Sequence, residues 1–238
     1  MMRYELYYWP SIQGRGEFVR LALEEAGADY VDVARRSGPG MGMTAMTRLL
    51  ESHARPSFAP PFLRVGKLIV GQTANILQYL GPRLGLAPRS EAGRLWAHQL
   101  QLTIVDLLDE AHDVHHPIAG SLYYHEQKRE ARRRAPYLTG ERLPKYLGYF
   151  EEILRAHGNR YLLGRSMSYV DLSIFQIMSG LSYAFPTTMR RLQPKYPRLI
   201  SVQERVAARP NIAAYLASER RLPFSEHGIF RHYLELDT

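Results

Sequence analysis

The sequence predicts a small α/β domain followed by an all-helical domain. Over the first 85 residues, short runs rich in aromatic and β-branched residues alternate with helical patterns. A tight turn at Gly66-Lys67 separates two further short apolar runs. After Pro88 the apolar residues recur at helical spacing almost to the end of the chain. We therefore expect one domain over residues 1–85 and a second over residues 89–238.

The first three elements are expected to form a strand–helix–strand unit. The aromatic run from Tyr4 to Trp9 predicts a strand, and the apolar face of residues 15–26 predicts a helix that Gly27 ends. Residues 30–33 predict a second strand. Because such a unit usually crosses over in the right-handed sense, we expect the two strands to be parallel.

The rest of the first domain is predicted as a helix, a hairpin and a helix. A short helix is expected over residues 44–52, and strands over 61–65 and 68–70. Pro61 has no backbone N–H, so it belongs at the first position of its strand. The last helix is expected to run to Leu84, with Thr73 as its N-terminal cap and Gly85 as its stop.

The second domain is predicted from three helical patterns. Apolar residues from Leu95 to Val114 indicate a long helix ended by Pro117, and residues 143–154 repeat the pattern. A third helix opens at Ser168-Tyr169-Val170-Asp171. Here Ser168 can accept from the N–H of Asp171 while Asp171 reaches back to the N–H of Ser168, which predicts a structural capping box.

The composition restricts the chemistry more than the location. The chain of 238 residues has no cysteine, which excludes disulfides, zinc-thiolate sites, iron–sulfur clusters and a cysteine nucleophile. Any thiol chemistry must therefore use a thiol from outside. The net charge of +8 favours acidic ligands without naming one. No signal peptide and no apolar run of the roughly 20 residues needed for a membrane span are visible, so we expect a cytoplasmic protein without a membrane contact.

Two groups of hydroxyl-bearing residues are candidates for a site. Backbone N–H groups at the helix start near Gln72 and Thr73 attract a carboxylate or phosphate, although an ordinary cap is the more common explanation. Tyr7 and Tyr8 end the first strand, and Ser11 lies in the loop that follows. A strand-end tyrosine is usually a core residue, so a catalytic role requires its hydroxyl to face a pocket.

Two charged clusters have simpler explanations than a ligand. His112 and His116 lie one helical turn apart and could bind a metal, but no third ligand stands at a diagnostic spacing. We expect a polar helix face or pocket wall there and no metal. The basic run over residues 128–134 lacks a base-reading motif, so we expect a solvated helix face and no nucleic acid.

Taken together, these segments resemble the tyrosine-type cytosolic glutathione transferases of the sigma, pi and mu kind. The matching residues are Tyr8-Trp9-Pro10, Gly14-Arg15-Gly16-Glu17, Arg20, Pro61-Phe62-Leu63, Gly66, residues 72–80 and Ser168-Tyr169-Val170-Asp171. They occur in the family's order and at its distances over nearly the whole chain. The resemblance implies a thioredoxin-like N-terminal domain, an all-helical C-terminal domain and a homodimer.

The resemblance also implies roles for individual residues, with glutathione as co-substrate and a role in detoxification. Tyr8 corresponds to the catalytic tyrosine, with Tyr7 and Ser11 as rivals. The residues expected to bind glutathione are Arg15, Pro60, the cis-proline Pro61, Gln72, Thr73 and Asp106 from the partner subunit. The expected wall of the electrophile pocket includes His112, His116 and Phe230.

The chemistry of such a tyrosine follows from ordinary pKa values. A free thiol has a pKa of about 8.5 and is mostly protonated at neutral pH, whereas the thiolate is the nucleophile. A tyrosine O–H donates better to a thiolate than to a thiol and therefore lowers the thiol pKa. A shift of about two units corresponds to ~2.7 kcal/mol.

Three departures from the family pattern keep other functions open. The loop from Tyr8 to Gly14 is one residue longer than usual, and Pro60 lacks the N–H that normally faces glutathione. The tryptophan and lysine of some classes are absent, and Arg48 or His53 could replace them. The alternatives are a transferase-fold binding or regulatory protein without turnover, and a glutathione-dependent peroxidase or isomerase.

Overall fold

The structure, a computed structural model, describes residues 3–52, 56–156, 158 and 160–237. It comprises two compact units, Met1–His98 with Ala208–Pro223, and Gln99–Ala207 with Phe224–Thr238. The boundary expected between residues 85 and 89 lies instead inside helix α4 (Glu91–Asp113). The first unit also takes in residues 208–223, a segment from far along the chain.

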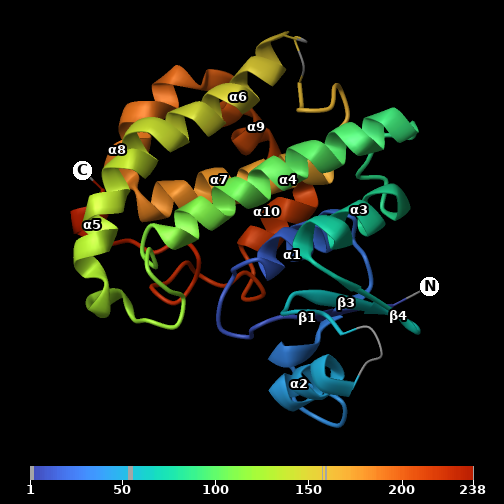
Figure 1. Cartoon of the computed structure of the whole chain (residues 1–238). Helices are drawn as coiled ribbons and strands as arrows, with labels where there is room; N and C mark the ends of the chain where they lie inside the picture. Colours follow the sequence, from blue (N-terminus) through green and yellow to red (C-terminus); the bar gives the residue numbers. More distant parts are fainter. Residues whose placement is uncertain (1–2, 53–55, 157, 159, 238) are drawn as a thin grey trace. The chain divides into compact units, whose positions relative to one another are not determined.

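The first unit is built on a four-stranded sheet (Figure 1). Its strands are β1 (Tyr4–Tyr7), β2 (Tyr30–Asp32), β3 (Phe62–Val65) and β4 (Leu68–Gly71), in the order β2-β1-β3-β4. The pair β1–β2 is parallel, and β1–β3 and β3–β4 are antiparallel. The predicted strand–helix–strand unit and hairpin are therefore confirmed.

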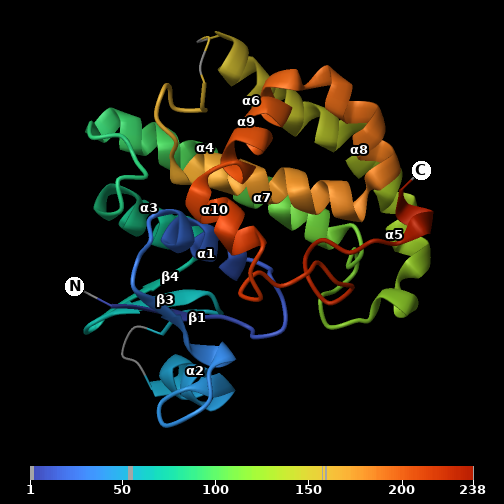
Figure 2. The same ribbon diagram turned by 180° about the vertical axis from the view of Figure 1, so that it is seen from behind.

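Helices cover both faces of this sheet. On one face, α1 (Gly16–Glu25) and α3 (Thr73–Arg83) bury an aliphatic core that includes Leu6 and Leu63. On the other face, the short 3₁₀ turn η1 (Val33–Arg35) and α2 (Gly42–Ser52) pack on a core that includes Tyr7 and Phe62. The late helix α10 (Pro210–Leu216) packs against α1 (Figure 2). Successive side chains of β1 thus point to opposite faces, as a pleated strand requires.

Two local predictions are wrong, each for a backbone reason. The first strand ends at Tyr7 and not at Trp9, because the residue that would face Tyr8 across the sheet is Pro61, which has no N–H to donate. Helix α3 is capped by Gln72, at φ +67°, and not by Thr73, which is already helical. The predicted stops at Gly27 and Gly85 are confirmed, since both residues adopt positive φ.

The second unit is helical, as predicted. Beyond the main part of α4, its helices are α5 (Lys128–Tyr137), α6 (Leu143–Ala156), α7 (Tyr169–Ala184), α8 (Pro186–Leu192) and α9 (Pro197–Ala207). A π-helical turn η3 (Leu138–Arg142) joins α5 to α6, and the short 3₁₀ turns are η2 (Tyr124–Glu126), η4 (Gln193–Lys195) and η5 (Leu234–Leu236). None of the described helices combines the length and hydropathy of a membrane span.

Helix α7 is buried over almost its whole length, and its predicted capping box is present. The Asp171 carboxylate accepts from the N–H and the hydroxyl of Ser168, both at 2.8 Å. Its second oxygen accepts from the N–H of Leu162, also at 2.8 Å. The structural assignment of Ser168 and Asp171 is therefore confirmed, and the same carboxylate also fixes the chain that enters the helix.

Candidate functional site

The sheet register brings three segments to one end of the first unit. Phe62 pairs with Tyr7 on one side and with Gly71 on the other. The chain neighbours Tyr8, Pro61 and Gln72 therefore leave the sheet at the same end, where α1 and α3 begin. The peptide bond between Pro60 and Pro61 is cis, as predicted for this position.

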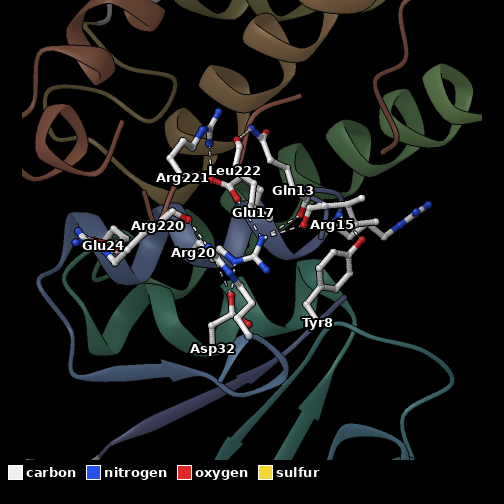
Figure 3. A network of polar contacts seen from close by, with 12 residues as sticks. Tyr8, Gln13, Arg15, Glu17, Arg20, Glu24, Asp32, Arg220, Arg221 and Leu222 are labelled. Carbon is white, nitrogen blue, oxygen red and sulfur yellow. Dashed lines mark hydrogen bonds and ion pairs between the residues drawn. The ribbon is translucent and has the colours of Figure 1, made fainter. Parts of the chain in front are cut away.

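The Tyr8 side chain lies on the backbone of the loop that precedes α1. Its hydroxyl oxygen accepts a hydrogen bond from the N–H of Arg15 at 2.8 Å, and the side chain is only 4% exposed (Figure 3). A Cβ at Gly14 would overlap this hydroxyl oxygen, and one at Gly16 would lie 2.5 Å from the ring. Glycine is therefore needed at both positions for the tyrosine to fit.

Arg15 also connects Tyr8 to the start of α3. The Thr73 hydroxyl lies 3.5 Å from the Arg15 carbonyl oxygen, so one residue's backbone contacts both hydroxyls. Gln72 is exposed at this point and holds a positive φ that is uncommon for a residue with a side chain. The structure thus brings Tyr8, Arg15 and Thr73 into contact, with Gln72 beside them.

The two rival hydroxyls lie elsewhere in the first unit. The Tyr7 hydroxyl donates to the Glu5 carboxylate at 2.8 Å, and its ring stacks on Phe62 on the α2 face. Burial and the Glu5 carboxylate raise the pKa of Tyr7 well above its usual range. Ser11 is exposed in a turn. Of the three candidates, Tyr8 is the one in contact with Arg15.

The surroundings of Tyr8 keep it neutral and leave it able to donate. Burial raises the pKa of Tyr8, while the hydrogen bond from Arg15 and the charges of Arg15 and Arg20 act in the opposite direction. The net shift is upward, so the phenol carries its proton at neutral pH. A hydroxyl that accepts through one lone pair can still donate its proton to an anion. Accepting from a backbone N–H also strengthens that donation.

A buried ionic network next to this loop goes beyond what the sequence predicts. The Arg20 guanidinium donates to Asp32 at 2.7 Å and to Glu17 at 3.2 Å, and both Arg20 and Glu17 are fully buried (Figure 3). The family resemblance includes Glu17 and Arg20 as motif residues without giving them a role. Charged residues three apart on the predicted buried face of a helix, among Phe18 and Leu21, are a signal that could have revealed the pair.

The remaining predicted site residues belong to the second unit. His112 and His116 lie with ring centroids 5.0 Å apart, and Asp106 is exposed on α4. His115, which lies between His112 and His116 in the sequence, is buried, and its Nε2 lies 2.7 Å from the carbonyl oxygen of Ile229. Phe230 is 4% exposed, and its ring lies against Gly180.

Neither charged cluster of the second unit gathers the groups that a metal needs. Among the described residues, no group of three or more His, Asp or Glu side chains is arranged to hold a metal ion. The basic run lies on α5, where Lys128 pairs with Glu235 at 2.5 Å and Arg134 with Asp113 at 3.7 Å.

The two residues expected as substitutes for the missing tryptophan and lysine belong to the first unit. Arg48 lines a small cavity beside Tyr7 on the α2 face, and His53 lies outside the described residues.

Comparison with known proteins agrees with this architecture. Residues 112–219 match the family described as "Glutathione S-transferase, C-terminal domain". A glutathione S-transferase of Plasmodium falciparum is 24% identical over 90% of this chain and 95% of its own length. Glutathione S-transferase P 1 of Xenopus laevis is 27% identical over 93% and 95%.

The resemblance to the glutathione transferases is confirmed over most of the chain.

Solved structures show that the chain also has the fold of these proteins. The pi-class glutathione S-transferase of Onchocerca volvulus superposes with a TM-score of 0.69 at 24% identity, covering 90% of this chain and 91% of the other. The prostaglandin synthase D of Nilaparvata lugens superposes with a TM-score of 0.71 at 21% identity, covering 93% and 100%. The expected arrangement of a thioredoxin-like domain followed by a helical domain is thereby confirmed.

Proposed function

We propose that this chain is a glutathione transferase that stabilises the glutathione thiolate through the Tyr8 hydroxyl and conjugates it to small hydrophobic electrophiles. The observation that carries the proposal is the hydrogen bond from the Arg15 N–H to the Tyr8 oxygen. It fixes a neutral, buried donor at the end of the sheet where α3 begins. A donor in that position favours an anion beside it.

The proposed reaction uses the Tyr8 hydroxyl, water and the two substrates. The bound thiol loses its proton to water, and the Tyr8 O–H donates to the resulting thiolate. Because this hydrogen bond is stronger to the anion than to the thiol, it lowers the thiol pKa. The sulfur lone pair then attacks the electrophilic carbon. A carbon–sulfur bond forms, and either a leaving group departs with its electron pair or the electrons pass to an acceptor atom that is then protonated.

Glutathione itself would be held by the start of α3 and by the cis-proline turn. The backbone N–H groups and hydroxyl at Thr73, together with the exposed Gln72, suit the carboxylate of the γ-glutamyl end. Pro60 offers only its carbonyl to the cysteinyl backbone, so this protein binds the tripeptide with one hydrogen bond fewer at that point. The proposal keeps Arg15 in the binding site, and Asp106 of a second copy in a homodimer.

The electrophile would be bound by the second unit. His112 lies on α4 and His116 follows it directly, so the two imidazole rings supply polar groups. Phe230 supplies an apolar ring. Aromatic and imidazole walls of this kind suit a flat hydrophobic substrate with a polar group. The proposal places the reaction in the cytoplasm, where reduced glutathione is abundant.

The test is the pKa of the glutathione thiol in the binary complex, measured from the ultraviolet absorbance of the thiolate against pH. Tyr8→Phe should raise this pKa by about two units, because the ring remains and only the donor is lost. Tyr7→Phe and Ser11→Ala are the matched controls and should leave it unchanged. An unchanged pKa in Tyr8→Phe, or a shift of the same size in either control, would refute the assignment of Tyr8.

The same preparation separates the alternative functions. Conjugation should be measured with a panel of aryl halides, epoxides and enones, alongside hydroperoxide reduction and double-bond isomerisation with the same thiol. Glutathione binding without any of these activities would instead favour a binding protein. The Pro60 departure from the family pattern is the feature that motivates this second candidate.

A further inference from the structure

We propose that the segment of residues 215–222 is a positioning element for Tyr8, and that Gln13 and Arg221 are the residues through which it acts. This inference rests on the proposed function, because it assumes that Tyr8 is the thiolate donor. Hereafter residues 215–222 are called the C-terminal clamp. The clamp begins in the last turn of α10 and belongs to the same compact unit as Tyr8.

One end of the clamp holds the loop between β1 and α1. The Gln13 side-chain amide donates to the carbonyl oxygen of Leu222. The backbone carbonyl of Gln13 accepts from the N–H of Glu17 at 3.0 Å and from the guanidinium of Arg20 at 3.3 Å. Gln13 is 5% exposed, so these contacts form away from solvent. The loop is therefore fixed from the clamp side and from the α1 side at one residue.

Two further residues of the clamp, Tyr215 and Arg221, hold the first turn of α1. The Glu17 carboxylate accepts from the Arg221 guanidinium (Figure 3) and also from the Tyr215 hydroxyl at 2.7 Å. It also accepts from Arg20 at 3.2 Å. Glu17 is fully buried, and a carboxylate in such a place depends strongly on its partners because little water is present to solvate it.

Arg15 lies between these two anchored residues, and it carries the N–H that contacts Tyr8. The Tyr8 ring and hydroxyl rest directly on Gly14 and Gly16, so a displacement of the loop changes the contacts of the tyrosine. A small loop movement would lengthen the N–H···O bond or turn the hydroxyl away from the sulfur. Catalytic groups are sensitive to displacements of this size. The clamp thus sets the donor geometry without touching the substrate.

The decisive comparison is between neighbouring arginines of the clamp. Arg221→Ala removes a guanidinium that reaches Glu17 and is 10% exposed. Arg220→Ala removes the same charge, but this guanidinium is 55% exposed and pairs at 2.9 Å with Glu24, on the next turns of α1. Gln13→Met keeps the size of the side chain and removes the donor to Leu222. The readout is again the pKa of the bound glutathione thiol.

We expect Arg221→Ala and Gln13→Met to raise the thiol pKa by about half to one unit, which lowers the thiolate fraction roughly 3- to 10-fold below that pKa. Arg221→Lys keeps the positive charge beside Glu17 and should recover part of the shift. Arg220→Ala should leave the pKa unchanged. Circular dichroism and the melting temperature check that each variant folds. If Arg221→Ala does not fold, the thiol pKa of Gln13→Met decides the outcome.

Repeating both substitutions in the Tyr8→Phe background separates the two proposals. If the clamp acts through Tyr8, neither substitution shifts the thiol pKa further in that background. If Tyr8→Phe itself shifts nothing, the proposed function fails. If Tyr8→Phe raises the pKa but folded Gln13→Met and Arg221→Ala do not, or if Arg220→Ala shifts it equally, the clamp inference is wrong and the function of Tyr8 stands.

Discussion

Replacement of Gly16 by alanine should destabilise this protein, against the usual effect of that substitution in a helix. Gly16 is the first residue of α1, where alanine is favoured over glycine by up to about 1 kcal/mol. The added Cβ, however, would lie 2.5 Å from two Tyr8 ring carbons, where an ordinary contact is about 3.5–4.0 Å. Overpacking of this kind costs roughly 1–3 kcal/mol. We expect a net loss of up to about 2 kcal/mol.

Removal of the tyrosine ring should relieve most of this loss. In a Tyr8→Ala background the two ring contacts at 2.5 Å are gone and only the Cβ of residue 8 stays close, at 2.9 Å, so Gly16→Ala should destabilise much less than in the wild-type chain. Both tryptophans, Trp9 and Trp96, belong to the first unit, so their fluorescence reports its unfolding in urea. All four proteins are compared at one concentration. A stabilising Gly16→Ala in the wild-type chain, or the same effect in both backgrounds, would refute the contact.

Three further predictions concern the second unit. Burial lowers the pKa of His115 to about 3 in the folded protein, whereas an unfolded histidine titrates near 6.5. Below pH 6.5 the unfolded state therefore binds one more proton than the folded state. The free energy of unfolding should fall as the pH falls. His115→Gln should remove this pH dependence. Between pH 6.5 and 5 the unfolding free energy of the wild-type chain, measured in urea titrations, should fall by roughly 2 kcal/mol more than that of the variant. Parallel plots of unfolding free energy against pH would contradict this. Asp171→Ala leaves two buried backbone N–H groups without their acceptor and should lower the unfolding free energy by about 2–5 kcal/mol. Ser168→Ala is the control and should cost less. Equal losses in the two variants would argue against a carboxylate that holds both Ser168 and Leu162. Gly180→Ala should displace the Phe230 ring, which occupies the space that the added methyl group would take, and should lower the melting temperature, whereas Gly148→Ala on α6, where nothing lies within 4 Å, should not.

The order of elements followed from local patterns in the sequence. Aromatic runs, the Gly66 turn, the helix stops at Gly27 and Gly85, and the Ser168–Asp171 capping box each depend on residues only a few positions apart. Such signals act through backbone dihedral preferences and nearby hydrogen bonds, which are present in the sequence itself. The prediction failed by one or two residues where a neighbouring strand decided the end, as at Tyr7, whose strand stops because Pro61 cannot pair beyond it.

The candidate site was only partly predictable, because its geometry depends on packing between distant residues. The sequence identified Tyr8, Arg15 and Thr73 as a set only through resemblance to a family. The strand register brings the Arg15 backbone to the hydroxyls of Tyr8 and Thr73. The same register turns Tyr7 toward Glu5, on the side of the sheet opposite to Tyr8. A one-residue change of register would exchange the two tyrosines, since side chains alternate along a strand.

The sequence by itself restricted the chemistry: with no cysteine in the chain, any thiol reaction of this protein must use a thiol from outside. The tertiary structure decided which tyrosine hydroxyl contacts the Arg15 backbone and which distant residues hold that loop. The contact between Glu17 and Tyr215 joins residues 198 positions apart, and no local pattern predicts it. Such contacts are selected by burial, because a carboxylate removed from water is stable only where the folded chain brings partners to it.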